Sequence, residues 1–212
     1  MAALLTADTL VVSQRAKLVE LTNQYDIWDP QGVALGFIDE PAQSRLRKTA
    51  RFATSIGQFL THRLTVRDVA DGDVLEVIRP AKVVKSRLSV RTGDRRPVGE
   101  IVQDNVFGKI RFTLTDADGR RVGQVRAENW RAWDFAIVNR DGREVARIDK
   151  RFVGVLKAVF TTADTYVVHI DPTLDGDLRL LAIAAAAAVD TALKQDERRL
   201  DISDVTDIFG LG

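Results

Sequence analysis

The sequence predicts an all-β fold, a closed antiparallel barrel of about twelve strands around a buried C-terminal hydrophobic helix. Two observations predict it: a recurring strand, turn and strand unit, and an alanine-rich run that is apolar on every side. The chain has 212 residues, of which 45% are hydrophobic and 29% charged, the mixture of a folded domain with a sizeable core. We expect one domain over residues 1–212, with its central helix at about 178–194 and a tail at about 196–212.

The strand, turn and strand units share one layout. An alternating apolar run ends in Asp or Asn with Gly close behind, and the alternation then resumes, in residues 28–36, 69–74, 115–123 and 139–146. Residues 92–101 form a degenerate fifth copy. Glycine supplies the positive φ of a tight turn, and the Asp or Asn side chain can close that turn. Each unit therefore predicts a β-hairpin.

Strict alternation is clearest in residues 111–115 and 134–138, where one face is apolar and the other is expected to face water. A sheet of so many antiparallel strands tends to close, because open edges invite aggregation.

The predicted helix contains ten uninterrupted apolar residues between Arg179 and Asp190. Asp175 and Asp177 lie just upstream of it and favour a helix N-terminus. A membrane span needs about 20 apolar residues, so this run is too short to cross a bilayer. A helix that is apolar all round must then be enclosed by protein, and the interior of the predicted barrel provides that enclosure.

Several function classes lack support. The chain has no cysteine, which excludes disulfide frameworks and thiolate zinc sites and fits a cytosolic protein. Asp8 interrupts the N-terminal apolar residues before a signal peptide forms. His62 and His169 are far apart, and no nucleophile turn or glycine-rich phosphate loop occurs. We expect a cytoplasmic protein that is not an enzyme and needs no cofactor or metal.

Charge is unevenly distributed along the chain. Residues 1–40 carry a net −4, 41–100 carry +7, 101–160 carry +4 and 161–212 carry −6. A basic surface can engage phosphate groups, although ordinary solvated strand faces would carry the same residues. Residues 42–60 have few β-branched side chains and predict a basic helix or an ordered loop. The candidate lipid-binding residues are Arg45, Arg47, Lys48, Arg51, Lys82, Lys85 and Arg87.

Two blocks carry a resemblance to a known family. Residues 21–32 (LTNQYDIWDPQG) resemble the opening hairpin of phospholipid scramblases, and residues 145–166 (VARIDKRFVGVLKAVFTTADTY), followed by the apolar helix, resemble their C-terminal part. The chain is thus similar over nearly its whole length to the phospholipid scramblase and LURP-one-related family. The resemblance implies the tubby-like fold, a twelve-stranded barrel that encloses a C-terminal helix.

The resemblance also bears on calcium and on lipid anchoring. Scramblases carry an acidic segment, proposed to bind calcium, directly before the helix. Here Thr162 and Thr173 stand where carboxylates are expected, which leaves Asp164, Asp171 and Asp175. Calcium takes six to eight oxygen ligands, so we expect no calcium site. With no cysteine, a palmitoyl anchor has no attachment point.

Two functions remain open. In the first, the protein is a peripheral module that binds anionic, phosphoinositide-like headgroups at the inner face of the membrane. In the second, it is a scaffold whose barrel surface binds another protein. Lipid scrambling is a weaker third alternative, since the helix is too short to span a bilayer. Nucleic acid is not an expected partner.

Overall fold

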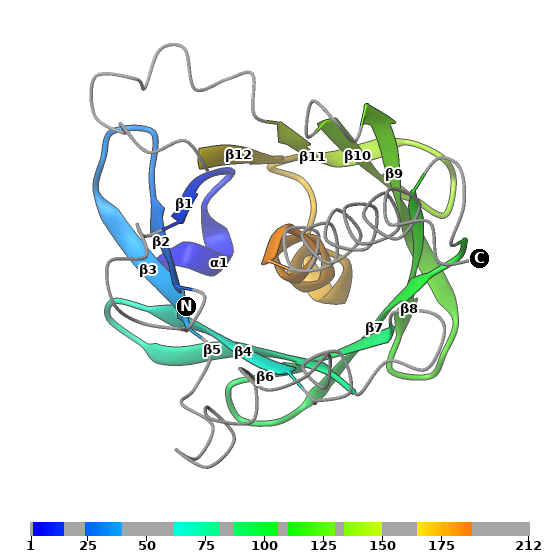
Figure 1. Ribbon diagram of the computed structural model, residues 1–212, viewed down its shortest axis with the longest axis horizontal. Helices are drawn as coiled ribbons and strands as arrows, with labels where there is room; N and C mark the ends of the chain where they lie inside the picture. Colours follow the sequence, from blue (N-terminus) through cyan, green and yellow to red (C-terminus); the bar gives the residue numbers. More distant parts are fainter. Residues whose placement is uncertain are drawn as a thin grey trace, which may run out of the picture.

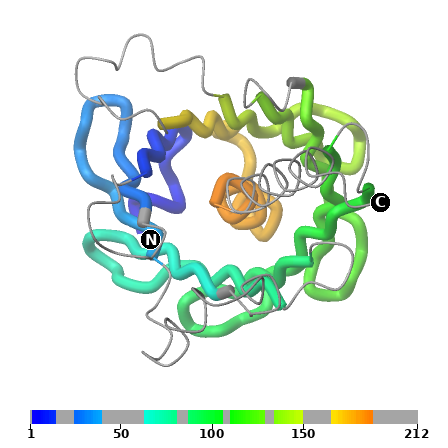
Figure 2. Tube along the Cα trace, viewed as in Figure 1, coloured from blue at the N-terminus to red at the C-terminus, as the bar shows by residue number. Residues whose placement is uncertain are grey.

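The computed structural model describes residues 2–14, 24–39, 62–80, 87–105, 110–129, 134–149 and 165–187. Within these residues the chain forms a closed antiparallel barrel, in which each strand pairs with its neighbours in sequence and the first strand closes the wall against the last (Figure 1). This architecture confirms the fold class predicted from the sequence. The helical residues 176–187 lie inside the ring of strands (Figure 2).

Twelve strands make up the wall. They are β1 (Thr9–Gln14), β2 (Gln24–Trp28), β3 (Ala34–Asp39), β4 (His62–Asp68), β5 (Gly72–Arg79), β6 (Arg87–Thr92), β7 (Pro97–Gln103), β8 (Arg111–Asp116), β9 (Arg121–Asn129), β10 (Asp134–Asn139), β11 (Glu144–Asp149) and β12 (Thr165–Ile170). Val11 of β1 lies opposite both Trp28 of β2 and Val167 of β12, which places β1 between β2 and β12.

Three of the four predicted hairpins share one turn structure. In the β2–β3 turn, Oδ1 of Asp29 accepts the backbone N–H groups two and four residues later, at 2.9 and 2.8 Å. Gly32 completes that turn with a φ of 85°. Asp116 and Asn139 accept the equivalent pairs of N–H groups in the β8–β9 and β10–β11 turns. The two parts of the sequence pattern therefore have separate roles. The Asp or Asn side chain accepts the backbone N–H groups, and the Gly adopts the left-handed conformation.

The degenerate fifth unit forms the β6–β7 hairpin with different residues in the same roles. Oγ1 of Thr92 accepts the N–H of Arg96 at 3.0 Å, as the carboxylate does elsewhere. Arg95 has a φ of 70° and takes the position that glycine holds in the other turns. Gly93 is required for a different reason, because a Cβ there would lie 1.7 Å from the backbone oxygen of Asp73.

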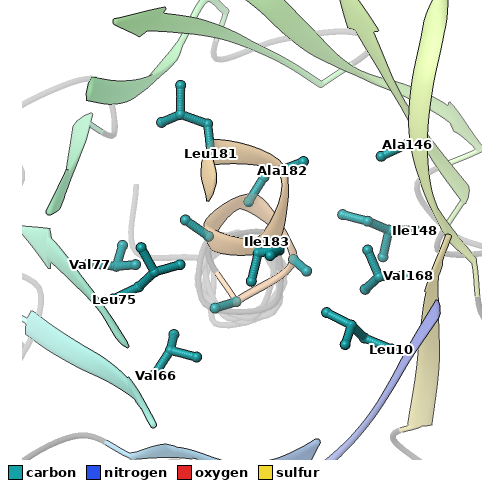
Figure 3. Close-up of a cluster of buried hydrophobic side chains, with 14 of the residues drawn as sticks. Leu10, Val66, Leu75, Val77, Ala146, Ile148, Val168, Leu181, Ala182 and Ile183 are labelled. Carbon is teal, nitrogen blue, oxygen red and sulfur yellow. The ribbon is translucent and has the colours of Figure 1, made fainter. Parts of the chain in front are cut away.

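The central helix is enclosed by the wall, as its composition predicts. Residues 181–187 are all buried, and inward-facing side chains such as Leu75 and Ile148 surround them (Figure 3). The hydroxyl of Tyr166 donates to the carbonyl oxygen of Ala186 at 3.0 Å. No helix within the described ranges has the length and hydropathy to cross a membrane.

The helix begins at residue 176, two residues before the predicted start, while residues 188–194 lie outside the described part of the chain. Asp177 is one of these two additional residues, and its charge favours the helix N-terminus. Its Oδ1 atom lies 2.9 Å from Nη2 of Arg96, so the start of the helix is also joined to the β6–β7 hairpin.

A short helix that the sequence analysis did not predict, α1 (Ala3–Thr6), lies inside the ring next to β1 and β3 (Figure 1). Leu4 is fully buried, and its N–H donates to Oδ2 of Asp68 at 2.9 Å. Gly36 of β3 makes room for it, because a Cβ at that position would lie 2.6 Å from Cδ1 of Leu4.

Asp68 is buried between α1 and the β4–β5 turn. Burial by itself would raise the pKa of Asp68, but the backbone N–H groups of Leu4, Ala70 and Asp71 all donate to its carboxylate. These donors outweigh the burial and hold the pKa below its ordinary value of 3.8. The carboxylate is therefore charged at neutral pH and joins α1 to the wall.

Arg179 joins α1 to the central helix. Its buried guanidinium donates to the carbonyl oxygens of Leu5 at 2.7 Å, Ala7 at 2.7 Å and Leu174 at 3.1 Å. Its Nη2 atom also lies 3.2 Å from Oδ1 of Asp8. One side chain thus satisfies several backbone acceptors that have no strand partner.

One expectation about β10 is wrong. Its outer face was expected to meet water, yet Asp134, Ala136 and Val138 are buried, with 6, 3 and 5% of their surface exposed. Asp134 accepts a hydrogen bond from Arg147 of β11. Ala136 lies between Arg126 and Arg147 on the adjacent strands, whose long side chains flank the small one.

The antiparallel order places successive connections at alternate ends of the barrel. We call one end the hairpin end; its connections are residues 29–33, 69–71, 93–96, 117–120, 140–143 and 171–175. We call the other the connection end; its strands are joined by residues 15–23, 40–61, 80–86, 104–110, 130–133 and 150–164. Since β1 starts at the hairpin end, α1 lies there too.

Candidate functional site

The two ends of the barrel differ in charge. The six segments that join strands at the connection end contain 13 Lys and Arg residues and four Asp and Glu residues. The six at the hairpin end contain five basic and seven acidic residues. The strand ends that these basic segments join therefore share one end of the barrel, although they are far apart in the sequence.

Six of the seven predicted lipid-binding residues belong to the segments 40–61 and 80–86, at the connection end, and lie outside the described residues: Arg45, Arg47, Lys48, Arg51, Lys82 and Lys85. The seventh, Arg87, is the first residue of β6. Its side chain is exposed, and Nη1 lies 2.8 Å from Oε2 of Glu100 on β7. At such exposure the pair adds little to stability, about 0–1 kcal/mol, and leaves the arginine accessible.

Several arginines of the described wall and turns form ion pairs with carboxylates. The ion pairs join Arg63 to Glu76, Arg67 to Asp39 and Asp73, Arg96 to Asp177, Arg120 to Asp118, Arg143 to Asp171 and Arg147 to Asp134 and Glu144. Hydrogen bonds that the Arg147 guanidinium donates to the Glu144 carboxylate raise the pKa of Arg147, which stays charged. These pairs neutralise the wall locally, so an arginine without such a partner is a better candidate for binding an external anion.

Sequence analysis missed one juxtaposition. Arg111 of β8 and Arg126 of β9 lie directly opposite each other, although 15 positions separate them in the chain. The alternation in residues 111–115 showed that Arg111 faces outward, but the pairing register, which the sequence does not show, was needed to place Arg126 beside it.

The acidic residues before the helix have other partners. Oδ1 of Asp171 accepts the N–H and the hydroxyl of Thr173 at 2.8 and 2.7 Å, and these bonds lower the pKa of Asp171. Asp175 is exposed, and Thr162 and Asp164 lie outside the described residues. Among the residues with described positions, no group of three or more His, Asp or Glu side chains could hold a metal ion.

Comparison with known proteins agrees with the fold. A family model described as Scramblase matches residues 1–193. A phospholipid scramblase family protein of Schizosaccharomyces pombe is 28% identical over 188 residues, which cover 81% of this chain and 48% of the relative. The chain thus spans about half the length of this curated relative. No solved structure matches. Because the family model covers nearly the whole chain, including the barrel and its helix, the chain belongs to the Scramblase family.

Proposed function

We propose that this protein is a non-enzymatic module that attaches reversibly to anionic membrane surfaces through the connection end of its barrel, with phosphoinositide-like headgroups as the preferred class. The observation that carries the proposal is the charge difference between the two ends. Membership of the Scramblase family and a relative named for phospholipid scrambling support a lipid partner.

The energetics fit a reversible contact. A basic residue near an anionic leaflet contributes about 1 kcal/mol, so the cluster of Arg45, Arg47, Lys48 and Arg51 alone supplies about 4 kcal/mol. Salt weakens such contacts, because charges are screened over about 8 Å at physiological ionic strength. The attachment should therefore be strong only where several basic segments act together.

The central helix supports attachment in preference to insertion. Residues 181–187 are already surrounded by the wall, so their apolar surface is not available to lipid unless the barrel opens. The described part of the core is packed without a bilayer, and the basic segments that join strands at the connection end provide the contact.

The test is co-sedimentation with liposomes. The variant Arg45→Gln, Arg47→Gln, Lys48→Gln and Arg51→Gln should lose most binding to vesicles that contain phosphatidylinositol 4,5-bisphosphate, while neutral vesicles bind neither protein. A matched control replaces four exposed arginines outside these segments, Arg91, Arg95, Arg121 and Arg140, by Gln and removes the same charge. This control should retain most of the binding.

Three results decide the matter. Loss of binding in the first variant alone supports the proposal, as does weaker binding of the wild type at 0.5 M salt than at 0.1 M. Equal loss in both variants would show that only net charge matters. If the wild type binds no anionic vesicle, the lipid role fails and the protein-binding scaffold takes its place.

A further inference from the structure

Arg111 and Arg126 form a pair of like charges on the outer wall of the barrel. Both side chains point outward, because their neighbours Phe112 and Val125 are buried in the core. The register places them directly opposite each other on β8 and β9. These two strands are neighbours in the wall (Figure 1). Side chains in directly opposed positions start from Cβ atoms about 5 Å apart, so the two guanidinium groups can reach a single small ligand.

Arg126 is held in place by its neighbours. Its Nε atom donates to Oε1 of Gln124 at 2.9 Å, and Nε2 of Gln124 donates to Oδ2 of Asp104 at 3.0 Å. Gln124 is itself buried, with 8% of its surface exposed. This chain of hydrogen bonds uses the Nε donor of Arg126 and fixes the plane of its guanidinium, while the two terminal nitrogens stay outside the chain.

Neither arginine of the pair has a direct ion-pair partner among the described residues, and the carboxylate of Asp104 is linked to Arg126 through Gln124. Neither guanidinium forms an ion pair with a described carboxylate, in contrast to the paired arginines of the same wall. Glu128, two residues further along β9, is exposed and forms no ion pair with either arginine. Like charges directly opposite each other disfavour the sheet, and a bound anion would remove that cost.

We propose that Arg111 and Arg126 form a binding site for one phosphate group, with Gln124 as the residue that positions Arg126. A phosphate accepts hydrogen bonds from planar guanidinium groups in a two-pronged geometry, which an immobilised arginine favours. Arg111 is the first residue of β8, so the site lies near the connection end. The inference that the phosphate belongs to a lipid headgroup rests on the proposed function. The inference that the two arginines bind phosphate does not.

The test measures two probes against three variants. The probes are inorganic phosphate, titrated by NMR on the Arg126 Nε–H signal, and vesicles containing phosphatidic acid, assayed by co-sedimentation. Arg111→Gln with Arg126→Gln should weaken binding of both probes about tenfold or more. Arg121→Gln with Arg140→Gln removes the same charge from two exposed arginines and should change binding less than about twofold.

Gln124→Leu separates a built site from diffuse charge, because it keeps the net charge and releases the Arg126 guanidinium. It should weaken phosphate binding several-fold with the thermal melt still cooperative.

The outcomes distinguish the site from the membrane role. Weaker binding of both probes in the arginine variant supports the site with lipid as its source, and weaker binding of inorganic phosphate alone supports the site with free phosphate as its ligand. If the Arg111 and Arg126 variant and the Arg121 and Arg140 control weaken phosphate binding equally, the site is overturned. That holds even where the four-residue variant of the proposed function still loses vesicle binding. Phosphate binding that depends on the pair in a protein that binds no vesicle would overturn only the membrane role.

Discussion

At the scale of single residues, the five hairpin turns show which features of a turn are interchangeable. Asp29, Asp116 and Asn139 provide a side-chain acceptor, and Thr92 provides the same acceptor through a hydroxyl. The left-handed position is less permissive, because a side chain there clashes with its own backbone. A non-glycine residue in this conformation costs about 1–2 kcal/mol. Arg95 carries that cost in the β6–β7 turn.

Arg95→Gly should therefore stabilise the protein. Relief of the left-handed strain exceeds the extra freedom that glycine gives the unfolded chain, so the free energy of unfolding should rise by about 0.5–1 kcal/mol. In a domain of this size that corresponds to an increase in Tm of about 2–3 °C. The matched control is Gly119→Ala, which meets no atom within 4 Å and should lower stability through its φ of 80° alone. A lower Tm for Arg95→Gly would contradict the argument.

The same scale explains what the sequence did and did not reveal about the site. The candidate basic residues could be identified from composition, because their charge does not depend on the fold. The arrangement of the phosphate site could not be identified in this way. Arg111 and Arg126 are neighbours only because of the pairing register of β8 and β9. Gln124 of β9 and Asp104 at the end of β7 are linked to Arg126 by hydrogen bonds. Register depends on turn lengths and on bulges such as those in β9 and β10, which local pattern does not define.

At the scale of elements, the prediction succeeded where a local signal was strong. The hairpins follow from the acceptor and glycine of each turn, and the central helix follows from a run that is apolar all round. Helix α1 has four residues and no side-chain cap, so it is too short for a hydrophobic periodicity to predict it from the sequence. Its position depends on contacts from distant parts of the chain, namely Asp68 on β4 and Arg179 on the central helix.

Arg179→Met should separate α1 from the central helix. The substitution keeps an apolar side chain of similar length but leaves the carbonyls of Leu5 and Ala7 without their donor. Loss of charge-assisted hydrogen bonds to buried acceptors should cost about 2–4 kcal/mol, measured by urea unfolding. Amide exchange of residues 4–7 should accelerate more than that of β7 or β8. A loss below about 0.5 kcal/mol, or uniform acceleration, would show that Arg179 does not hold α1.

At the scale of the whole molecule, the barrel separates stability from recognition. The hairpin end carries tight turns, α1 and the ordered links to the helix, and its connections carry a small excess of acidic residues. The connection end carries the longer segments and the excess of basic residues. A molecule polarised in this way orients itself in the field of an anionic surface before contact. The proposed attachment should therefore be end-on, with the barrel axis closer to the membrane normal than to its plane.

Because the chain has no cysteine, single labels can report this orientation. Pro80→Cys places a fluorophore on an exposed residue just after β5 at the connection end, and Gln31→Cys places one on an exposed residue of the β2–β3 turn at the hairpin end. On vesicles containing anionic lipid and a headgroup quencher, the first label should be quenched strongly and the second weakly, since the described barrel separates them by the length of its strands. Quenching should disappear at high salt, where screening shortens the reach of the charges to about 3 Å. Equal quenching of both labels at low salt would indicate side-on binding and would contradict the end-on orientation.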